Sequence, residues 1–142
     1  MQRAGMVHAL ETIHDLLKPG GILLDIHPTS EPAAIDVRLR GQIIPAGWIS
    51  ESDDYVEYEW ADEAAAAAVD RGLFARERSG TFKFVWHADS MSELRGYLAE
   101  EWKDAIVDDV TAMRTEELLK LPVPDKEILV REAIRIARYR CT

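Results

Sequence analysis

The sequence predicts an α/β protein, a small mixed sheet with helices packed against it. Three observations support this fold class. The chain opens with apolar residues at helical spacing. A Pro-Gly-Gly turn at residues 19–21 then leads into a short apolar run at residues 22–26. Further along, an alanine-rich helical pattern precedes a strand with alternating aromatic residues, so helices and strands follow each other in turn.

Composition and charge are those of an ordinary globular chain. Of 142 residues, 47% are hydrophobic and 30% are charged, so we expect one domain over residues 1–142. With 26 acidic against 17 basic residues the net charge is −9, which disfavours phosphate backbones and anionic lipid surfaces. We therefore expect no nucleic-acid partner and no membrane partner. A single cysteine, Cys141, and the lack of a secretion signal favour a cytoplasmic location.

The first helix and the first strand have the clearest boundaries. Met6, Leu10, Ile13 and Leu17 form an apolar stripe, which Pro19 and the two following glycines end. The apolar run at residues 22–26 is too short for a helix between such breakers. It is typical of a strand that is covered on both faces.

The middle of the chain gives weaker signals. Alternation over residues 35–39 predicts a half-exposed strand, and residues 43–49 continue as an edge strand or irregular ribbon because proline and glycine interrupt them. Residues 55–60 either form another short strand or lead directly into a helix. Residues 61–73 are alanine-rich and begin with acidic residues, which predicts a helix.

The last third contains a strand, a helix and an ambiguous segment. Residues 80–87 alternate, with Phe82, Phe84 and Trp86 on one face, and predict a strand. A capping box at residues 90–93 begins an apolar stripe that predicts one long helix up to Leu121. In residues 126–140 some apolar positions have helical spacing and others alternate as in a strand, and we favour the strand.

The segment from Ala9 to Ile26, ALETIHDLLKPGGILLDI, resembles class I S-adenosylmethionine-dependent methyltransferases. In that family a helix ends in a Leu-Lys-Pro-Gly-Gly turn that feeds the fifth strand of a Rossmann-like sheet. The later elements resemble, in their order, the sixth and seventh strands with their surrounding helices. The resemblance therefore implies the distal half of the fold, as a partial Rossmann-like sheet.

This resemblance also implies what the chain lacks. Family members bind their cofactor with a glycine-rich loop after the first strand and with an acidic residue at the second. These residues contain no G-x-G sequence. We therefore expect no cofactor in this chain alone, with S-adenosylmethionine bound only if a complementing N-terminal half is supplied. At most the chain is a fragment of a methyltransferase.

The resemblance implies an open edge as well. In the complete fold a fourth strand flanks the strand at residues 22–26, so the edge between Ile22 and Ile26 is exposed to pairing. Two coverings are open: the chain's own irregular segment from Val37 to Ile49, or a second subunit. We favour a homodimer through the edge near Ile22 and Ile26.

A second function is a non-catalytic, dimeric module that binds a small apolar or aromatic ligand. Its predicted substrate-binding residues lie near strand ends or in aromatic segments: His27, Trp48, Trp60 and His87. We assign no catalytic residue, because no nucleophile stands out near any histidine. We also predict no metal site, because no close pairing of ligand residues occurs in the sequence. Asp25, within the apolar strand, is interpreted as structural.

Overall fold

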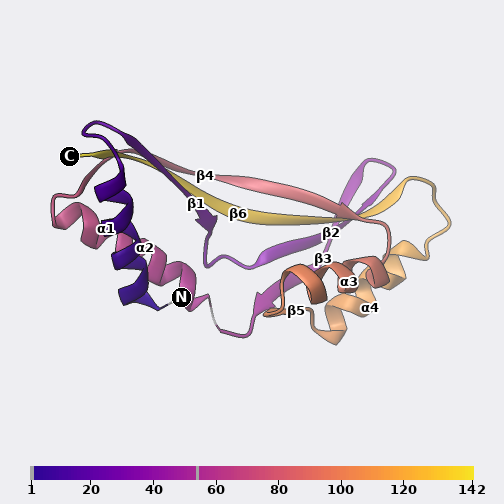
Figure 1. The fold of residues 1–142 in the computed structure, drawn as a ribbon. Coiled ribbons are helices and arrows are strands. Elements are labelled where there is room, and N and C mark those ends of the chain that lie inside the picture. The colour runs from indigo at the N-terminus through magenta and orange to yellow at the C-terminus, as the bar shows by residue number, and fades with distance from the viewer. Residues whose placement is uncertain (1, 54) are drawn as a thin grey trace. The chain divides into compact units, whose positions relative to one another are not determined.

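The computed structural model of the protein describes residues 2–53 and 55–142. This part of the chain forms four helices and six strands (Figure 1). In order they are α1 (Arg3–Leu16), β1 (Ile22–Pro28), β2 (Ala33–Leu39), β3 (Gln42–Glu51), α2 (Val56–Asp70), β4 (Phe74–Ala88), α3 (Met91–Glu101), β5 (Ala105–Ile106), α4 (Asp109–Leu119) and β6 (Lys126–Cys141).

The predicted α/β class is confirmed, but the sheet is antiparallel and the predicted mixed sheet is wrong. Its path runs β1-β6-β2-β3-β5, and β4 also pairs with β6. A tight turn explains part of the difference. Arg40 and Gly41 both have positive φ, which fits a two-residue hairpin turn and forces β2 and β3 to be antiparallel. The long final strand β6 runs antiparallel to both β1 and β2.

The ambiguous segment at residues 126–140 is therefore a strand, as favoured from the sequence. Its C-terminal part pairs with β1, from Ile134 to Arg140, and its N-terminal part pairs with β2, from Lys126 to Arg131. The predicted strand at residues 35–39 is also confirmed as part of β2. The ribbon after it is β3, whose register against β2 shifts between Ile35 and Asp36. This bulge is the irregularity that proline and glycine predicted.

Contacts along the chain divide it into two compact units. Unit 1 holds the described residues within Met1–Ser30, Tyr55–Phe82 and Ile134–Thr142, and unit 2 holds those within Glu31–Asp54 and Lys83–Ala133. Strands β4 and β6 therefore each contribute to both units. Each unit has its own apolar cluster.

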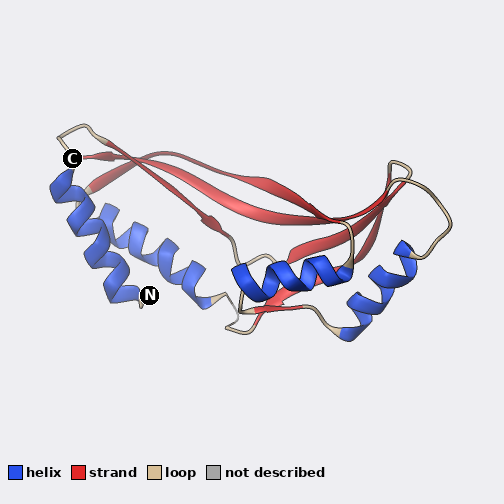
Figure 2. Ribbon diagram, turned by 45° about the vertical axis from the view of Figure 1, so that its right-hand side comes forward, coloured by secondary structure: helices blue, strands red, loops and turns tan. Residues whose placement is uncertain are grey.

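In unit 1, helices α1 and α2 lie on the same face of the strands (Figures 1 and 2). Leu10 and Ala68 from these helices pack with Leu23 of β1, Phe74 of β4 and Tyr139 of β6. On the opposite face of β1, no helix of the described chain covers the strand. The prediction that this strand is buried on both faces is wrong, because its even-numbered apolar residues are exposed.

In unit 2, α3 and α4 pack with β2, β3 and β6 around fully buried residues such as Ile35, Leu94 and Ile128. The predicted cap at Ser90 is confirmed: its hydroxyl accepts a hydrogen bond from the Glu93 amide at 3.1 Å. The Glu93 carboxylate accepts from the amide of Asp89, one residue before the cap, at 3.2 Å, so the reciprocal half of the capping box is shifted by one residue.

The single long helix predicted up to Leu121 is wrong. The chain leaves α3 at Trp102, whose indole donates to Glu51 at 2.8 Å, and then forms β5 against the end of β3. A new helix begins after Asp108, whose carboxylate accepts from the Thr111 amide at 2.7 Å. This second cap starts a separate helix, α4, although the apolar stripe in the sequence continues from α3 into it.

Two other boundaries differ from the predictions. Helix α2 begins at Val56, so residues 55–60 lead into the helix and form no strand. Strand β4 begins at Phe74, well before the predicted start at residue 80. Its exposed polar residues, including Arg76 and Glu77, lack the alternation that would reveal a strand. Residues 37–49 belong to the hairpin of β2 and β3, in which the two strands pair with each other and β2 also pairs with β6. Among the described residues they form no pair with β1, so the alternative in which this segment covers the edge of β1 is wrong.

Candidate functional site

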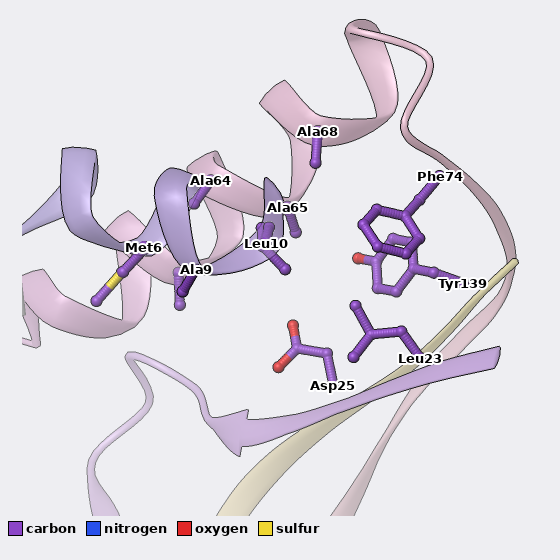
Figure 3. A pocket seen from close by; sticks show the side chains of 11 residues that line it. Met6, Ala9, Leu10, Leu23, Asp25, Ala64, Ala65, Ala68, Phe74 and Tyr139 are labelled. Carbon is purple, nitrogen blue, oxygen red and sulfur yellow. The ribbon is translucent and has the colours of Figure 1, made fainter. Parts of the chain in front are cut away.

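A cavity of about 200 Å³ lies between the two helices and the strands of unit 1 (Figure 3). Eleven residues line it, and ten of them carry no charge. The lining residues are Met6, Ala9, Leu10, Leu23, Asp25, Ala61, Ala64, Ala65, Ala68, Phe74 and Tyr139.

Small side chains on the two helices create this space. Ala9 on α1 and the alanines at positions 61, 64, 65 and 68 of α2 all face the cavity. Alanine favours the helix while presenting little volume. The larger side chains of Leu23, Phe74 and Tyr139 form the wall on the strand side. The Phe74 and Tyr139 rings meet edge to face, with centroids 6.4 Å apart.

Among the described residues that line the cavity, Asp25 is the one that carries a charge. Leu23, Asp25 and His27 alternate along β1 and therefore point to the face that carries the helices. Figure 3 shows the Asp25 carboxylate directed into the cavity beside Leu23. Its side chain is 28% exposed, and its Oδ1 lies 3.0 Å from His27 Nδ1. This carboxylate provides a hydrogen-bond acceptor in otherwise apolar surroundings.

Tyr139 adds a second polar group to the same wall. Burial raises the pKa of the Tyr139 hydroxyl, and the negative charge of Asp25 raises it further, against the opposing effect of Arg135 and Arg76. Within the described chain this hydroxyl makes no hydrogen bond. The phenol therefore stays protonated at neutral pH and can either donate or accept.

His27 links the cavity carboxylate to helix α2. Its Nε2 lies 3.0 Å from Asp62 Oδ1, so the imidazole bridges Asp25 and Asp62. The hydrogen bond to Asp25 raises the pKa of His27, burial opposes this increase, and the charges of both carboxylates support it. Arg135 Nε lies 3.4 Å from Asp62 Oδ1. The cluster formed by Asp25, His27, Asp62 and Arg135 is termed the His27 cluster below.

The four predicted substrate-binding residues divide between the units. His27 and Trp60, a half-buried residue of α2, belong to unit 1, and neither is among the residues that line the cavity. Trp48 and His87 belong to unit 2, and both are exposed. The four residues form no common pocket within either unit, and their role in binding stays a prediction.

Trp48 lines a separate depression in unit 2, together with Asp36, Arg114 and Arg131. Arg131 Nη2 lies 2.7 Å from Asp36 Oδ2, and Asp36 is only 2% exposed. Asp36 alternates with apolar residues in the strand that was predicted to be half-exposed, but it is buried. Because a buried carboxylate needs a partner, the arginine makes this burial possible. His87 Nδ1 lies 3.4 Å from Glu127 Oε1.

The sequence interpretation of Asp25 missed its place in the cavity. The available signal was a carboxylate within an apolar strand, followed two residues later by a histidine on the same face. Alanine spacing on α2 was a second signal, since positions 61, 64, 65 and 68 share one helix face.

A different apolar surface covers the face of β1 opposite the helices. Ile22, Leu24 and Ile26 are 37%, 57% and 57% exposed, and Ile26 pairs across the strands with the half-buried Ile136. Among the described residues, β1 pairs with β6 alone, so its second edge carries no partner strand. We call this face together with its edge the β1 surface.

Neither a metal centre nor a membrane-spanning helix is found in the described part of the chain. Its histidines, cysteine and carboxylates form no group suited to hold a metal ion. Residues 2–53 and 55–142 contain no helix of the length and apolarity needed to cross a bilayer. Comparisons with protein-family models, with curated proteins and with solved structures found no match for this chain.

Proposed function

We propose that this chain is the distal part of a class I S-adenosylmethionine-dependent methyltransferase fold, which needs a further polypeptide segment for its cofactor site. The single observation that supports this proposal is the unpaired β1 surface. The resemblance at residues 9–26 places a neighbouring strand against this edge. The structure has a helix, a turn at Gly20 and Gly21, and a strand in the same order.

The β1 surface has features of an edge that receives a partner. Soluble proteins usually protect open strand edges with lysine, proline or short strands. β1 has seven residues and no lysine, and its proline lies at the final position, Pro28. Three alternating apolar side chains stay exposed beside the open edge. Such a surface marks a place for another strand or subunit.

For the chain alone, we propose that a second copy covers this surface in a homodimer. A two-fold axis would pair β1 with β1 of the other copy, since an antiparallel edge is self-complementary. The test is light scattering at micromolar concentration. We expect a dimer for the natural chain and a monomer for Leu24→Lys, which places an ammonium group in the dimer contact. A control, Val110→Lys, changes an exposed residue of α4 and leaves the dimer intact.

Cofactor binding tests the methyltransferase relation itself. In calorimetry the chain alone is expected to bind neither S-adenosylmethionine nor S-adenosylhomocysteine. The DNA upstream of the Met1 codon, or a gene beside it, is expected to encode a glycine-rich loop after a predicted strand. A protein that includes this segment should then gain thermal stability with either ligand. Micromolar binding by the present chain alone would contradict the proposal, as would the lack of any such segment.

The cavity of unit 1 favours a second function, the binding of a small apolar ligand without catalysis. Ligand sites are commonly apolar spaces with a few directed polar groups, and this cavity has that composition. The test is a thermal-shift series with small aromatic compounds, in which a bound compound raises the unfolding temperature. No shift with any compound of one or two rings would contradict this function.

A further inference from the structure

We propose that the cavity of unit 1 binds a small hydrophobic amine, whose aromatic or aliphatic body fills the space and whose ammonium group donates to Asp25. This inference rests on the second function above, the binding of a small apolar ligand. It specifies the chemical class of that ligand.

The volume and walls define the body of the ligand. A dry apolar cavity of about 150 Å³ is large enough for benzene. At about 200 Å³, this cavity fits one aromatic ring with a short chain. Phe74 and Tyr139 present ring surfaces toward it, and Met6 offers a flexible thioether (Figure 3). The alanines on the helix side leave the space open.

Asp25 defines the head group. An ionised carboxylate accepts hydrogen bonds and cannot donate them. Its Oδ1 is engaged by His27, while its Oδ2 has no hydrogen-bond partner among the described residues. A bound anion would be repelled by Asp25. An apolar ligand without a donor would remove water from the carboxylate and give nothing in return. An ammonium group satisfies the free oxygen with a charge-assisted hydrogen bond.

The Tyr139 hydroxyl favours the same ligand. It lies in the cavity wall with Asp25 and makes no hydrogen bond within residues 2–53 and 55–142. Its oxygen can accept a second hydrogen from an ammonium group that already donates to the carboxylate. An amine therefore finds two acceptors in this one wall.

Charges on the surrounding elements make the binding depend on pH. The groups near Asp25 are His27 on the same strand, Asp62 on α2, Arg135 on β6 and Arg76 on β4, whereas the lining residues of α1 are uncharged. Protonated His27 competes with a ligand cation for Asp25. When His27 loses its proton, the site becomes more negative while an alkyl ammonium group stays charged. Amine affinity should therefore rise with pH through the pKa of His27, which lies above its ordinary value.

The experiment compares 2-phenylethylamine with 2-phenylethanol, which has the same body and a neutral hydroxyl head. The full chain is titrated with each compound and followed by amide NMR shifts at pH 6 and pH 9. We expect the amine to bind at least about tenfold more tightly than the alcohol at pH 9 and to weaken at pH 6. Asp25→Asn should weaken the amine by about tenfold or more and leave the alcohol nearly unchanged. The matched control Asp15→Asn removes an exposed carboxylate of α1 and should change neither affinity.

The possible outcomes distinguish the amine inference from the small-ligand function on which it rests. Equal binding of amine and alcohol overturns the amine inference while the small-ligand function stands. Failure of both compounds to bind overturns the amine inference, and the small-ligand function is overturned as well only if the thermal-shift series with compounds of one or two rings also gives no shift. If Asp25→Asn does not fold, the comparison of the two compounds on the natural chain and its pH dependence still decide the question. Reciprocally, the bound amine should lower the pKa of His27, which the histidine ring resonances report.

Discussion

Replacing His27 by glutamine tests the electrostatics of the His27 cluster. The pKa of His27 is raised in the folded protein, because the imidazolium donates to Asp25 and Asp62. A raised folded pKa means that the stabilising contribution is fully present below the unfolded pKa, about 6.5, and is lost as the pH rises through the folded value. His27→Gln should therefore reduce stability most under acidic conditions.

The expected loss of unfolding free energy depends on how exposed the side chains of His27, Asp25 and Asp62 are. The side chains of His27 and Asp25 are 12% and 28% exposed, so their hydrogen bond is sheltered and contributes about 1.5–3 kcal/mol while the imidazole is charged. Asp62 is 46% exposed, and its bond contributes about 0–1 kcal/mol. We expect His27→Gln to lose about 2–3 kcal/mol at pH 5.5. A neutral imidazole retains one ordinary hydrogen bond of about 1 kcal/mol, so the loss should shrink at pH 9.

Urea unfolding at pH 5.5 and pH 9 measures both differences, and the His27 ring resonance gives the folded pKa directly. The control is His8→Gln, which removes another imidazole from a strongly exposed position on α1. It should leave the unfolding free energy nearly unchanged at both pH values. A loss in His27→Gln that is constant with pH, or that grows toward pH 9, would falsify the assignment of a stabilising imidazolium.

Four further substitutions test the packing and capping of unit 2. Leu94→Ala removes a fully buried side chain and should lower the free energy of unfolding by about 2–5 kcal/mol in urea. Gly47→Ala should lower the free energy of unfolding by about 1–3 kcal/mol, because the new Cβ would lie 2.2 Å from Thr111 Oγ1. Gly96→Ala should instead raise it by about 0.5–1 kcal/mol, because a Cβ at this position of α3 has no neighbour within 4 Å and alanine favours the helix. Asp108 has a lowered pKa from its hydrogen bond to the Thr111 amide, so the natural protein should lose stability as the pH falls through that pKa, and Asp108→Asn should reduce this acid dependence in circular dichroism.

Local signals predicted helices and strands well wherever one residue decides the backbone. The turn at Gly20 and the cap at Ser90 are such positions, and the structure has both. The strand at residues 126–140 could be identified only weakly. Its arginines and apolar residues fit both periodicities, and its pairing with β1 and β2 is a long-range property.

What the sequence did not reveal depended on partners distant in the chain. The strand at residues 35–39 was predicted to be half-exposed, yet Asp36 within it is buried, with Arg131 of β6 as its ion-pair partner. Asp25 was interpreted as structural, yet its carboxylate faces a cavity whose other walls come from helices and strands elsewhere in the sequence. The exposure of the β1 face opposite the helices could not be predicted from the sequence for a similar reason. An apolar run indicates that cover is needed, but it does not show whether the same chain provides it.

The position of β6 has a consequence for synthesis. It is the last of the six strands to leave the ribosome, yet β1, β2 and β4 all pair with it. Until residues 126–141 emerge, β1, β2 and β4 lack the strand with which they pair, so the edges that face β6 stay unpaired. Native pairing then joins residues more than a hundred positions apart, such as Ile22 and Arg140, which slows folding. During this period the unpaired strand edges make the nascent chain prone to aggregation.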